Sequence, residues 1–147
     1  MLYVRLAEDQ VHALLRKART IAVVGASSKP DRPSNRVMRI LIAAGYDVIP
    51  VNPRETEVLG LEAYPSLEAV PEPIEIVDVF RRAEETPAIA REAARVGAKT
   101  LWLQLGIINQ EAASLASAAG LSVVMDRCIG DSVESFGIEH HRTGAPS

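Results

Sequence analysis

The sequence predicts an α/β fold in which a parallel β-sheet is covered by helices on both faces. Short apolar runs rich in Val, Ile and Leu alternate along the chain with segments whose apolar residues recur at helical spacing. The apolar runs have almost no polar side, as expected for strands that are buried on both faces of a parallel sheet. The 147 residues fit one domain, residues 1–147, with enough chain for a substantial core.

Five segments are predicted as strands because they are short, apolar and rich in β-branched residues. They are residues 21–24, 47–51, 74–80, 101–105 and 121–125. Consecutive parallel strands are joined by right-handed crossovers, which leaves few possible arrangements. We expect a doubly wound, Rossmann-like sheet of five strands in the order 3-2-1-4-5, with an additional N-terminal helix.

Helices are predicted before the first strand and in the connections that follow. After the first strand, apolar residues recur at i, i+3, i+4 and i+7 from Val37 to Ala44, and Gly45 stands where a helix would stop. Ser66 and Thr86 are predicted as N-caps. The other predicted helices are residues 8–19, 66–70, 86–96 and 110–119.

The composition argues against several classes of partner. With 19 acidic and 16 basic residues the net charge is −3, so general basicity does not favour nucleic-acid binding. No run approaches the ~18 apolar residues of a membrane span, and the N-terminus lacks the pattern of a secretory signal, so we expect a cytoplasmic protein without membrane contact. A single cysteine, Cys128, and three histidines without ligand spacing predict neither a disulfide nor a metal site.

The chemistry is expected at the carboxyl edge of the sheet, where ligands bind in open α/β folds. The first predicted strand ends at Gly25, and the loop after it offers backbone N–H groups, a helix N-terminus and the charge of Lys29 or Arg36. This combination suits a phosphate group. Polar, basic or turn-forming residues also follow the other strands: Asn52, Pro53, Arg54, Arg81, Arg82, Gly106 and Cys128.

Two common nucleotide-binding sequence patterns are missing, which narrows the kinds of nucleotide expected as the ligand. The loop has one glycine where the dinucleotide pattern G-x-G-x-x-G needs three, and the NTPase pattern G-x-x-x-x-G-K-[ST] is not found. The second predicted strand ends in Asn52, Pro53 and Arg54, where NAD-binding domains place an acidic residue for the ribose hydroxyl. An arginine suits a ribose that carries a phosphate, which NADP and coenzyme A both have.

Several motifs carry a resemblance to a known family. VVGASSKP, SNRVM, VIPVNP, VDVF, GAKTLWLQLG and VVMDRC resemble the small stand-alone coenzyme A-binding proteins, which are similar to the nucleotide-binding domain of the succinyl-CoA synthetase α-subunit. The resemblance spans most of the chain. It implies that residues 25–29 and Arg36 contact the coenzyme phosphates, that residues 52–54 lie near the phosphorylated ribose and adenine, and that Phe80 and Arg81 flank the cofactor.

We expect a non-catalytic module whose small-molecule ligand is coenzyme A or an acyl-CoA, held by the phosphate-binding loop after the first strand. No paired catalytic carboxylates, Ser/His/Asp order or activated thiol stands out in the sequence, so an enzyme is not expected. Two alternatives stay open here: an NADP(H)-binding oxidoreductase, which Arg54 also suits, and a regulatory nucleotide-sensing or interaction domain. The predicted cofactor-binding residues are Gly25, Ala26, Ser27, Ser28, Lys29, Arg36, Asn52, Pro53, Arg54, Phe80, Arg81, Gln104, Gly106 and Cys128.

Overall fold

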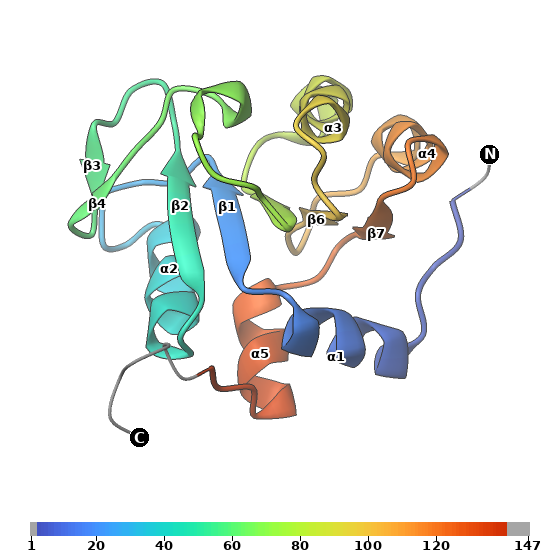
Figure 1. The fold of residues 1–147 in the computed structure, drawn as a ribbon, viewed down its shortest axis with the longest axis horizontal. Coiled ribbons are helices and arrows are strands. Elements are labelled where there is room, and N and C mark those ends of the chain that lie inside the picture. Colours follow the sequence, from blue (N-terminus) through green and yellow to red (C-terminus); the bar gives the residue numbers. More distant parts are fainter. Residues whose placement is uncertain (1–2, 141–147) are drawn as a thin grey trace.

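The fold is a five-stranded parallel sheet between two layers of helices (Figure 1). The computed structural model describes residues 3–140. The predicted α/β class, the five parallel strands and the N-terminal helix are confirmed. The sheet consists of β1 Thr20–Val24, β2 Asp47–Val51, β5 Ile76–Val79, β6 Thr100–Leu103 and β7 Ser122–Val124, and the helices are α1 Glu8–Lys17, α2 Pro33–Ala43, α3 Thr86–Arg95, α4 Gln110–Ala118 and α5 Ile129–Phe136. Smaller elements are the antiparallel pair β3 Glu57–Val58 and β4 Leu61–Glu62 and the short helices η1 Leu67–Ala69 and η2 Ala83–Glu85.

The strand order is β2-β1-β5-β6-β7, so the predicted order 3-2-1-4-5 misplaces the third strand. That strand, β5, pairs with β1, where Ile76 lies opposite Ile21, and not with the outer side of β2. The connection after β2 itself occupies that outer side, because Tyr64 N–H donates to the Pro50 carbonyl at 3.0 Å and the Tyr64 carbonyl accepts from Asn52 N–H at 2.9 Å. The order of the strands therefore reverses between β1 and β5, which is where such sheets bind ligands.

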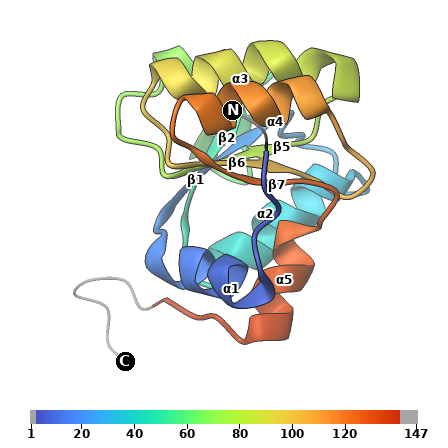
Figure 2. The same cartoon turned by 90° about the vertical axis from the view of Figure 1, so that its right-hand side faces the viewer.

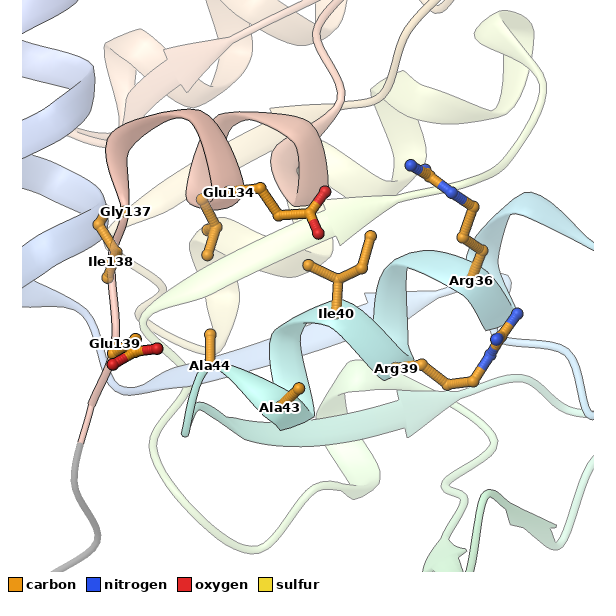
Figure 3. A pocket seen from close by; sticks show the side chains of 10 residues that line it. Arg36, Arg39, Ile40, Ala43, Ala44, Glu134, Gly137, Ile138 and Glu139 are labelled. Carbon is orange, nitrogen blue, oxygen red and sulfur yellow. The ribbon is translucent and has the colours of Figure 1, made fainter. Parts of the chain in front are cut away.

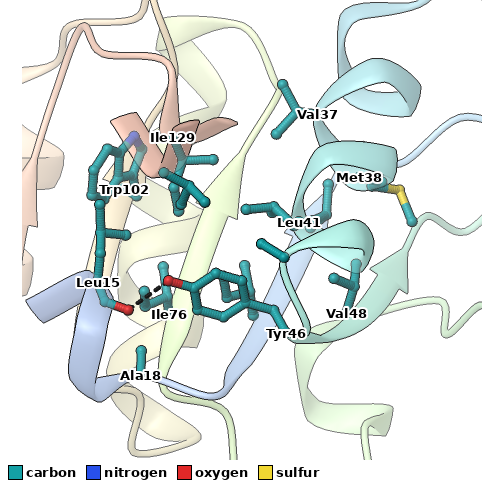
Figure 4. Packing of buried hydrophobic residues seen from close by; sticks show 14 of the residues in the cluster. Leu15, Ala18, Val37, Met38, Leu41, Tyr46, Val48, Ile76, Trp102 and Ile129 are labelled. Carbon is teal, nitrogen blue, oxygen red and sulfur yellow. Dashed lines mark hydrogen bonds between the residues drawn. The ribbon is translucent and has the colours of Figure 1, made fainter. Parts of the chain in front are cut away.

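Helices α1, α2 and α5 cover one face of the sheet, and α3 and α4 cover the other (Figure 2). The first face packs large side chains together, among them Trp102, which is fully buried as expected for a core residue (Figure 4). Here the Tyr46 hydroxyl donates to the Leu15 carbonyl at 2.5 Å. On the second face the helices contribute small side chains, which allow a close approach of helix and sheet; these are Ala90, Ala93, Ala112, Ala113 and Ala116.

The helix starts agree with the sequence in one case and differ in another. Ser66 caps η1, since its hydroxyl accepts from Ala69 N–H at 3.3 Å. Thr86 is not the cap of α3: Glu85 occupies that position, and the Thr86 hydroxyl donates to the Ala83 carbonyl of the preceding turn at 2.6 Å. The η2 turn thus provides the start of α3 that Thr86 was expected to provide.

Helix α5 was not predicted, and Arg127 joins it to α1. The Arg127 guanidinium donates to both carboxylate oxygens of Glu8 in α1, at 2.8 and 2.6 Å. Its Nε donates to the Ser132 hydroxyl of α5 at 2.7 Å. Phe136 of α5 stacks on His12 of α1, with ring centroids 4.4 Å apart. Among the helices described in the range 3–140, none has the length and apolar character needed to cross a membrane.

Candidate functional site

The site is built around a tight turn at the carboxyl end of β1. Gly25 has a φ of +89°, and its N–H donates to the Val51 carbonyl at the end of β2, at 2.9 Å. A Cβ at this position would lie 2.6 Å from the carbonyl oxygen of Phe80, immediately after β5. Both the positive φ and the close approach require glycine. The turn therefore brings together the ends of three neighbouring strands.

Two asparagine side chains hold the loop that follows Gly25. The Asn52 amide donates to the Ala26 carbonyl at 2.8 Å, and the buried Asn35 amide donates to the Ser27 carbonyl at 2.9 Å. The Ser27 hydroxyl accepts from Lys29 N–H at 3.1 Å. Because these bonds come from the residue after β2, from α2 and from the loop itself, the loop has its conformation before a ligand arrives. Such preorganisation lowers the entropic cost of binding.

A cleft of about 1150 Å³ opens at this edge of the sheet. Six basic side chains line it against two carboxylates, although the chain as a whole is acidic. Lys29, Arg36 and Arg54 come from three different segments and line the same cleft. A local excess of positive charge in a concave site attracts anionic ligands. The basic residues of the cleft are Lys29, Arg32, Arg36, Arg54, Arg81 and Arg82.

Arg36 and Arg81 of the cleft already bind carboxylates of the protein, as does the more exposed Arg82, which pairs with Glu84 and Glu85. Arg36 Nη2 donates to Asp131 Oδ1 at 3.0 Å, and this hydrogen bond is the main reason that the pKa of Arg36 is raised. Arg81 donates through Nε and Nη2 to one Glu85 oxygen, at 3.2 and 2.7 Å, and so lowers the pKa of Glu85. These ion pairs are partly or largely exposed, and solvent therefore weakens them.

Lys29 and Arg54 are different from these arginines. No ion pair joins either side chain to another residue in the part of the chain that the structure describes. Both residues are exposed at the cleft. The backbone N–H of Arg54 donates to the Asn52 side-chain oxygen at 2.9 Å, which fixes the turn. This bond does not involve the Arg54 guanidinium. Together with Arg32, which also forms no ion pair among the described residues, Lys29 and Arg54 carry the charges that an incoming anion can meet without breaking an existing ion pair.

A buried amide and a buried carboxyl group lie together beside the cleft. Gln104 is 4% exposed and lines the cleft, and its Nε2 donates to Asp78 Oδ1. Asp78 lies in β5 and is fully buried, and its second oxygen has no hydrogen-bond partner among the described residues. Burial raises the pKa of Asp78 well above its ordinary value. The carboxyl group of Asp78 therefore sets the orientation of Gln104 at the cleft.

Cys128 has an evident structural position at the start of α5. Its sulfur accepts from Asp131 N–H at 3.5 Å, and the residue is half-buried at the lining of the cleft. Cys128 is predicted from the sequence to contact the cofactor. In the structure it is also the N-cap of α5. Within residues 3–140, no three His, Cys, Asp or Glu side chains are placed to hold a metal ion.

All predicted site residues except Ala26 and Gly106 line the cleft. Ala26 is fully buried, and Gly106, between the lining residues Leu105 and Ile107, donates its N–H to Asp126 Oδ1 at 2.7 Å. Glu55 directly follows the predicted Arg54, so extending that segment by one residue would have found it. Asp131 depends on α5, which the sequence did not predict. The lining residues outside the predicted set are Arg32, Pro33, Ser34, Val37, Glu55, Arg82, Leu105, Ile107 and Asp131.

A second groove of about 710 Å³ runs between α2 and α5 (Figure 3). Ile40 and Ile138 give it an apolar lining, and Arg39 and Glu139 add charges at its rim. Arg36 lines both this groove and the cleft. The groove and the candidate site therefore share the Arg36 side chain.

The comparison with known protein families shows to which family the chain belongs. The profile of the family described as the CoA binding domain matches residues 19–133. The chain belongs to this family. The matched range of the CoA-binding domain begins just before β1 and ends within α5, so it includes the Gly25 loop and the lining of the cleft.

Relatives of this CoA-binding domain are found as small proteins and as parts of large ones. The uncharacterized protein YneT of Bacillus subtilis (strain 168) is 42% identical over 123 residues, which are 84% of this chain and 91% of YneT. The solved structure of a hypothetical protein from Pyrococcus horikoshii OT3 has 40% identity and a TM-score of 0.87, and covers 92% of this chain and 99% of that one. Acetate–CoA ligase (ADP-forming) I of Archaeoglobus fulgidus is 26% identical over 122 residues, but the match covers 18% of the ligase.

Proposed function

We propose that this protein binds coenzyme A or an acyl-CoA in the cleft, as a binding module without catalytic activity of its own. The observation that carries the proposal is the meeting of Lys29, Arg36 and Arg54 around one cleft in a member of the CoA-binding domain family. Coenzyme A has three phosphate groups, and charge-assisted hydrogen bonds to such groups are among the strongest that a protein surface makes. The cleft thus has the charge that this ligand neutralises.

In the proposed mode, the diphosphate lies on the loop after Gly25 and the 3′-phosphorylated ADP extends towards Arg54. Support comes from the glycine, which lets a ligand approach the main chain, and from the unpaired guanidinium beyond β2. The pantetheine arm then runs in the opposite direction, past β5 towards Leu105 and Ile107, which follow β6. The strand order supports this direction, because β2 and β6 lie on opposite sides of β1 and β5.

Separate titrations with CoA, NADPH and NADH test the ligand. A ligand that binds only the folded protein raises its melting temperature, and calorimetry gives the affinity. We expect CoA to stabilise the protein and to bind more tightly than either dinucleotide. Tighter binding of NADPH would support the oxidoreductase alternative instead, and no response to any of the three would refute nucleotide binding.

The absence of catalysis needs its own measurement. The match to the acetate–CoA ligase covers a small part of that enzyme, which supports a binding role for this domain by itself. We expect no release of free thiol when the protein is incubated with acetyl-CoA at concentrations that saturate the cleft. Turnover that depends on protein concentration, and that disappears in Arg54→Ala, would contradict the proposed non-catalytic role.

A further inference from the structure

The loop expected to hold phosphate already holds a carboxylate of the protein. Ser28 N–H donates to Glu55 Oε2 at 2.7 Å, and the Ser28 hydroxyl donates to Glu55 Oε1 at 3.2 Å. Ser28 carries one of the backbone N–H groups that the sequence assigns to the phosphates. Glu55 is not in the predicted set, and it lies opposite the loop, at the cleft.

The geometry of this contact is that of an anion on two donors. The two carboxylate oxygens of Glu55 each accept one hydrogen bond from Ser28, as two oxygens of one phosphate group would. The shorter contact has the length of a charge-assisted hydrogen bond. Only one residue supplies both donors, so a ligand phosphate and the Glu55 carboxylate compete for the same place.

The surrounding turn delivers Glu55 to this position. Glu55 N–H donates to the Asn52 carbonyl at 3.2 Å, and the Asn52 amide is bonded to the Ala26 carbonyl at 2.8 Å. The turn after β2 is thus tied to the loop after β1, and Glu55 is partly buried between them. The contact with Ser28 follows from how the two segments are joined and does not depend on a freely moving surface side chain.

The other carboxylate of the cleft makes a comparable contact. Asp131 binds Arg36, which is also expected to contact phosphate. Each of the two carboxylates that line the cleft is therefore bonded to a group that the proposed mode assigns to the ligand. Glu55 differs because it occupies the main-chain N–H and the hydroxyl of Ser28. These two donors cannot bind two anions at once.

We propose that Glu55 is an internal competitor of the ligand, which occupies the anion site at Ser28 until a phosphate group of the ligand displaces it. The inference rests on the proposed function for the identity of the phosphate-bearing ligand. The apparent affinity is then lowered by the fraction of molecules in which Glu55 occupies the site. A ligand without an anionic group at this position does not compete with Glu55 for Ser28, so the contact also favours ligands that place a phosphate there.

Glu55→Gln tests the proposal, with Glu57→Gln as a matched control. Both variants lose one negative charge, but Glu57 is exposed on β3 and does not line the cleft. We expect Glu55→Gln to bind CoA about three- to tenfold more tightly, as a site occupied by the carboxylate in roughly two thirds to nine tenths of molecules requires. Glu57→Gln is expected to change the affinity by less than about twofold, the scale of a remote exposed charge.

The melting temperature of the ligand-free protein is expected to change in the opposite direction to the affinity for CoA. Without ligand, Glu55→Gln is expected to melt at a lower temperature than the wild type, because the charge-assisted bond to Ser28 is lost. Lower stability together with tighter CoA binding is the signature of a displaced competitor. Unchanged or weaker CoA binding in Glu55→Gln, relative to Glu57→Gln, would overturn the proposal, since a carboxylate that contacts the ligand directly has that effect.

Inorganic pyrophosphate separates this proposal from the proposed function. The Ser28 amide resonance of the ¹⁵N-labelled protein is followed during the titration, and we expect it to move at lower pyrophosphate concentration in Glu55→Gln than in the wild type. If neither protein binds CoA but this difference is seen, the proposed function fails and the competitor remains. If CoA binds equally to both proteins and the Ser28 resonance responds identically to pyrophosphate, the competitor fails alone.

Discussion

Replacing Gly25 with alanine tests the turn on which the cleft is built. The φ of +89° is in the left-handed region, which costs a residue other than glycine about 1–2 kcal/mol. The added Cβ would lie 2.6 Å from the Phe80 carbonyl oxygen, a main-chain atom at the end of β5. Overpacking of this kind costs about 1–3 kcal/mol. We therefore expect Gly25→Ala to lower the free energy of unfolding by about 2–5 kcal/mol, the sum of these two effects.

Gly97→Ala is the control, because Gly97 has a similar φ of +77° but no atom within 4 Å of an added Cβ. Only the conformational cost of about 1–2 kcal/mol applies there. Urea unfolding followed by circular dichroism measures both variants. Equal losses of unfolding free energy would refute the reasoning that the approach of Phe80 determines the residue at position 25. A folded Gly25→Ala protein is also expected to bind CoA more weakly than Gly97→Ala.

Three further predictions concern charge, protonation and packing. Lys29→Ala and Arg54→Ala are each expected to weaken CoA binding by about 1–3 kcal/mol in calorimetry, and unchanged affinity in both would exclude the proposed mode. Because burial raises the pKa of Asp78, the folded protein keeps a proton that the unfolded chain loses, so the free energy of unfolding falls as pH rises above the ordinary carboxyl pKa. Asp78→Asn should remove this fall, which urea midpoints measured at several pH values will show. Tyr46→Phe loses the bond to the Leu15 carbonyl and should cost about 1–2 kcal/mol in the same assay.

The strands could be predicted because burial on both faces leaves a continuous apolar run in the sequence. The strand from Asp47 to Val51 has the same bounds in the prediction and in the structure. Strand order is a different kind of information, since it depends on which face of the sheet a connection crosses. The long segment after β2 carries Leu67 into the core beneath α3 and α4, and no local pattern indicates that side.

Helix α5 shows why a short helix can be missed. Its eight residues include Gly130, Asp131 and Ser132, which have low helix propensity. The helix is stabilised by packing, because Ile129 and Val133 are buried in the core formed with α2. A Cβ at Gly130 would lie 3.2 Å from the Ile40 side chain, so glycine allows the close approach of α2 and α5.

The lining of the cleft could be predicted in large part because parallel strands end at one edge. Residues in the loops that follow the strands, such as Lys29, Arg54 and Arg81, were expected to lie near one another once the sheet was parallel. The partners of these residues could not be predicted in the same way. Whether Arg36 binds Asp131, or Ser28 binds Glu55, depends on the docking of separate segments, which periodicity and spacing do not describe.

The link between Arg127 and Glu8 has a consequence for how the protein is made. These residues are 119 positions apart, so α1 emerges from the ribosome long before the segment it packs against. Contacts of such sequence separation close long loops, which slows folding. Cys128 and Asp131 belong to the same late segment, and they line the cleft. A growing chain therefore completes its ligand site only after synthesis has passed α5, and until then α1 and α2 lack one of the helices they pack with on that face of the sheet.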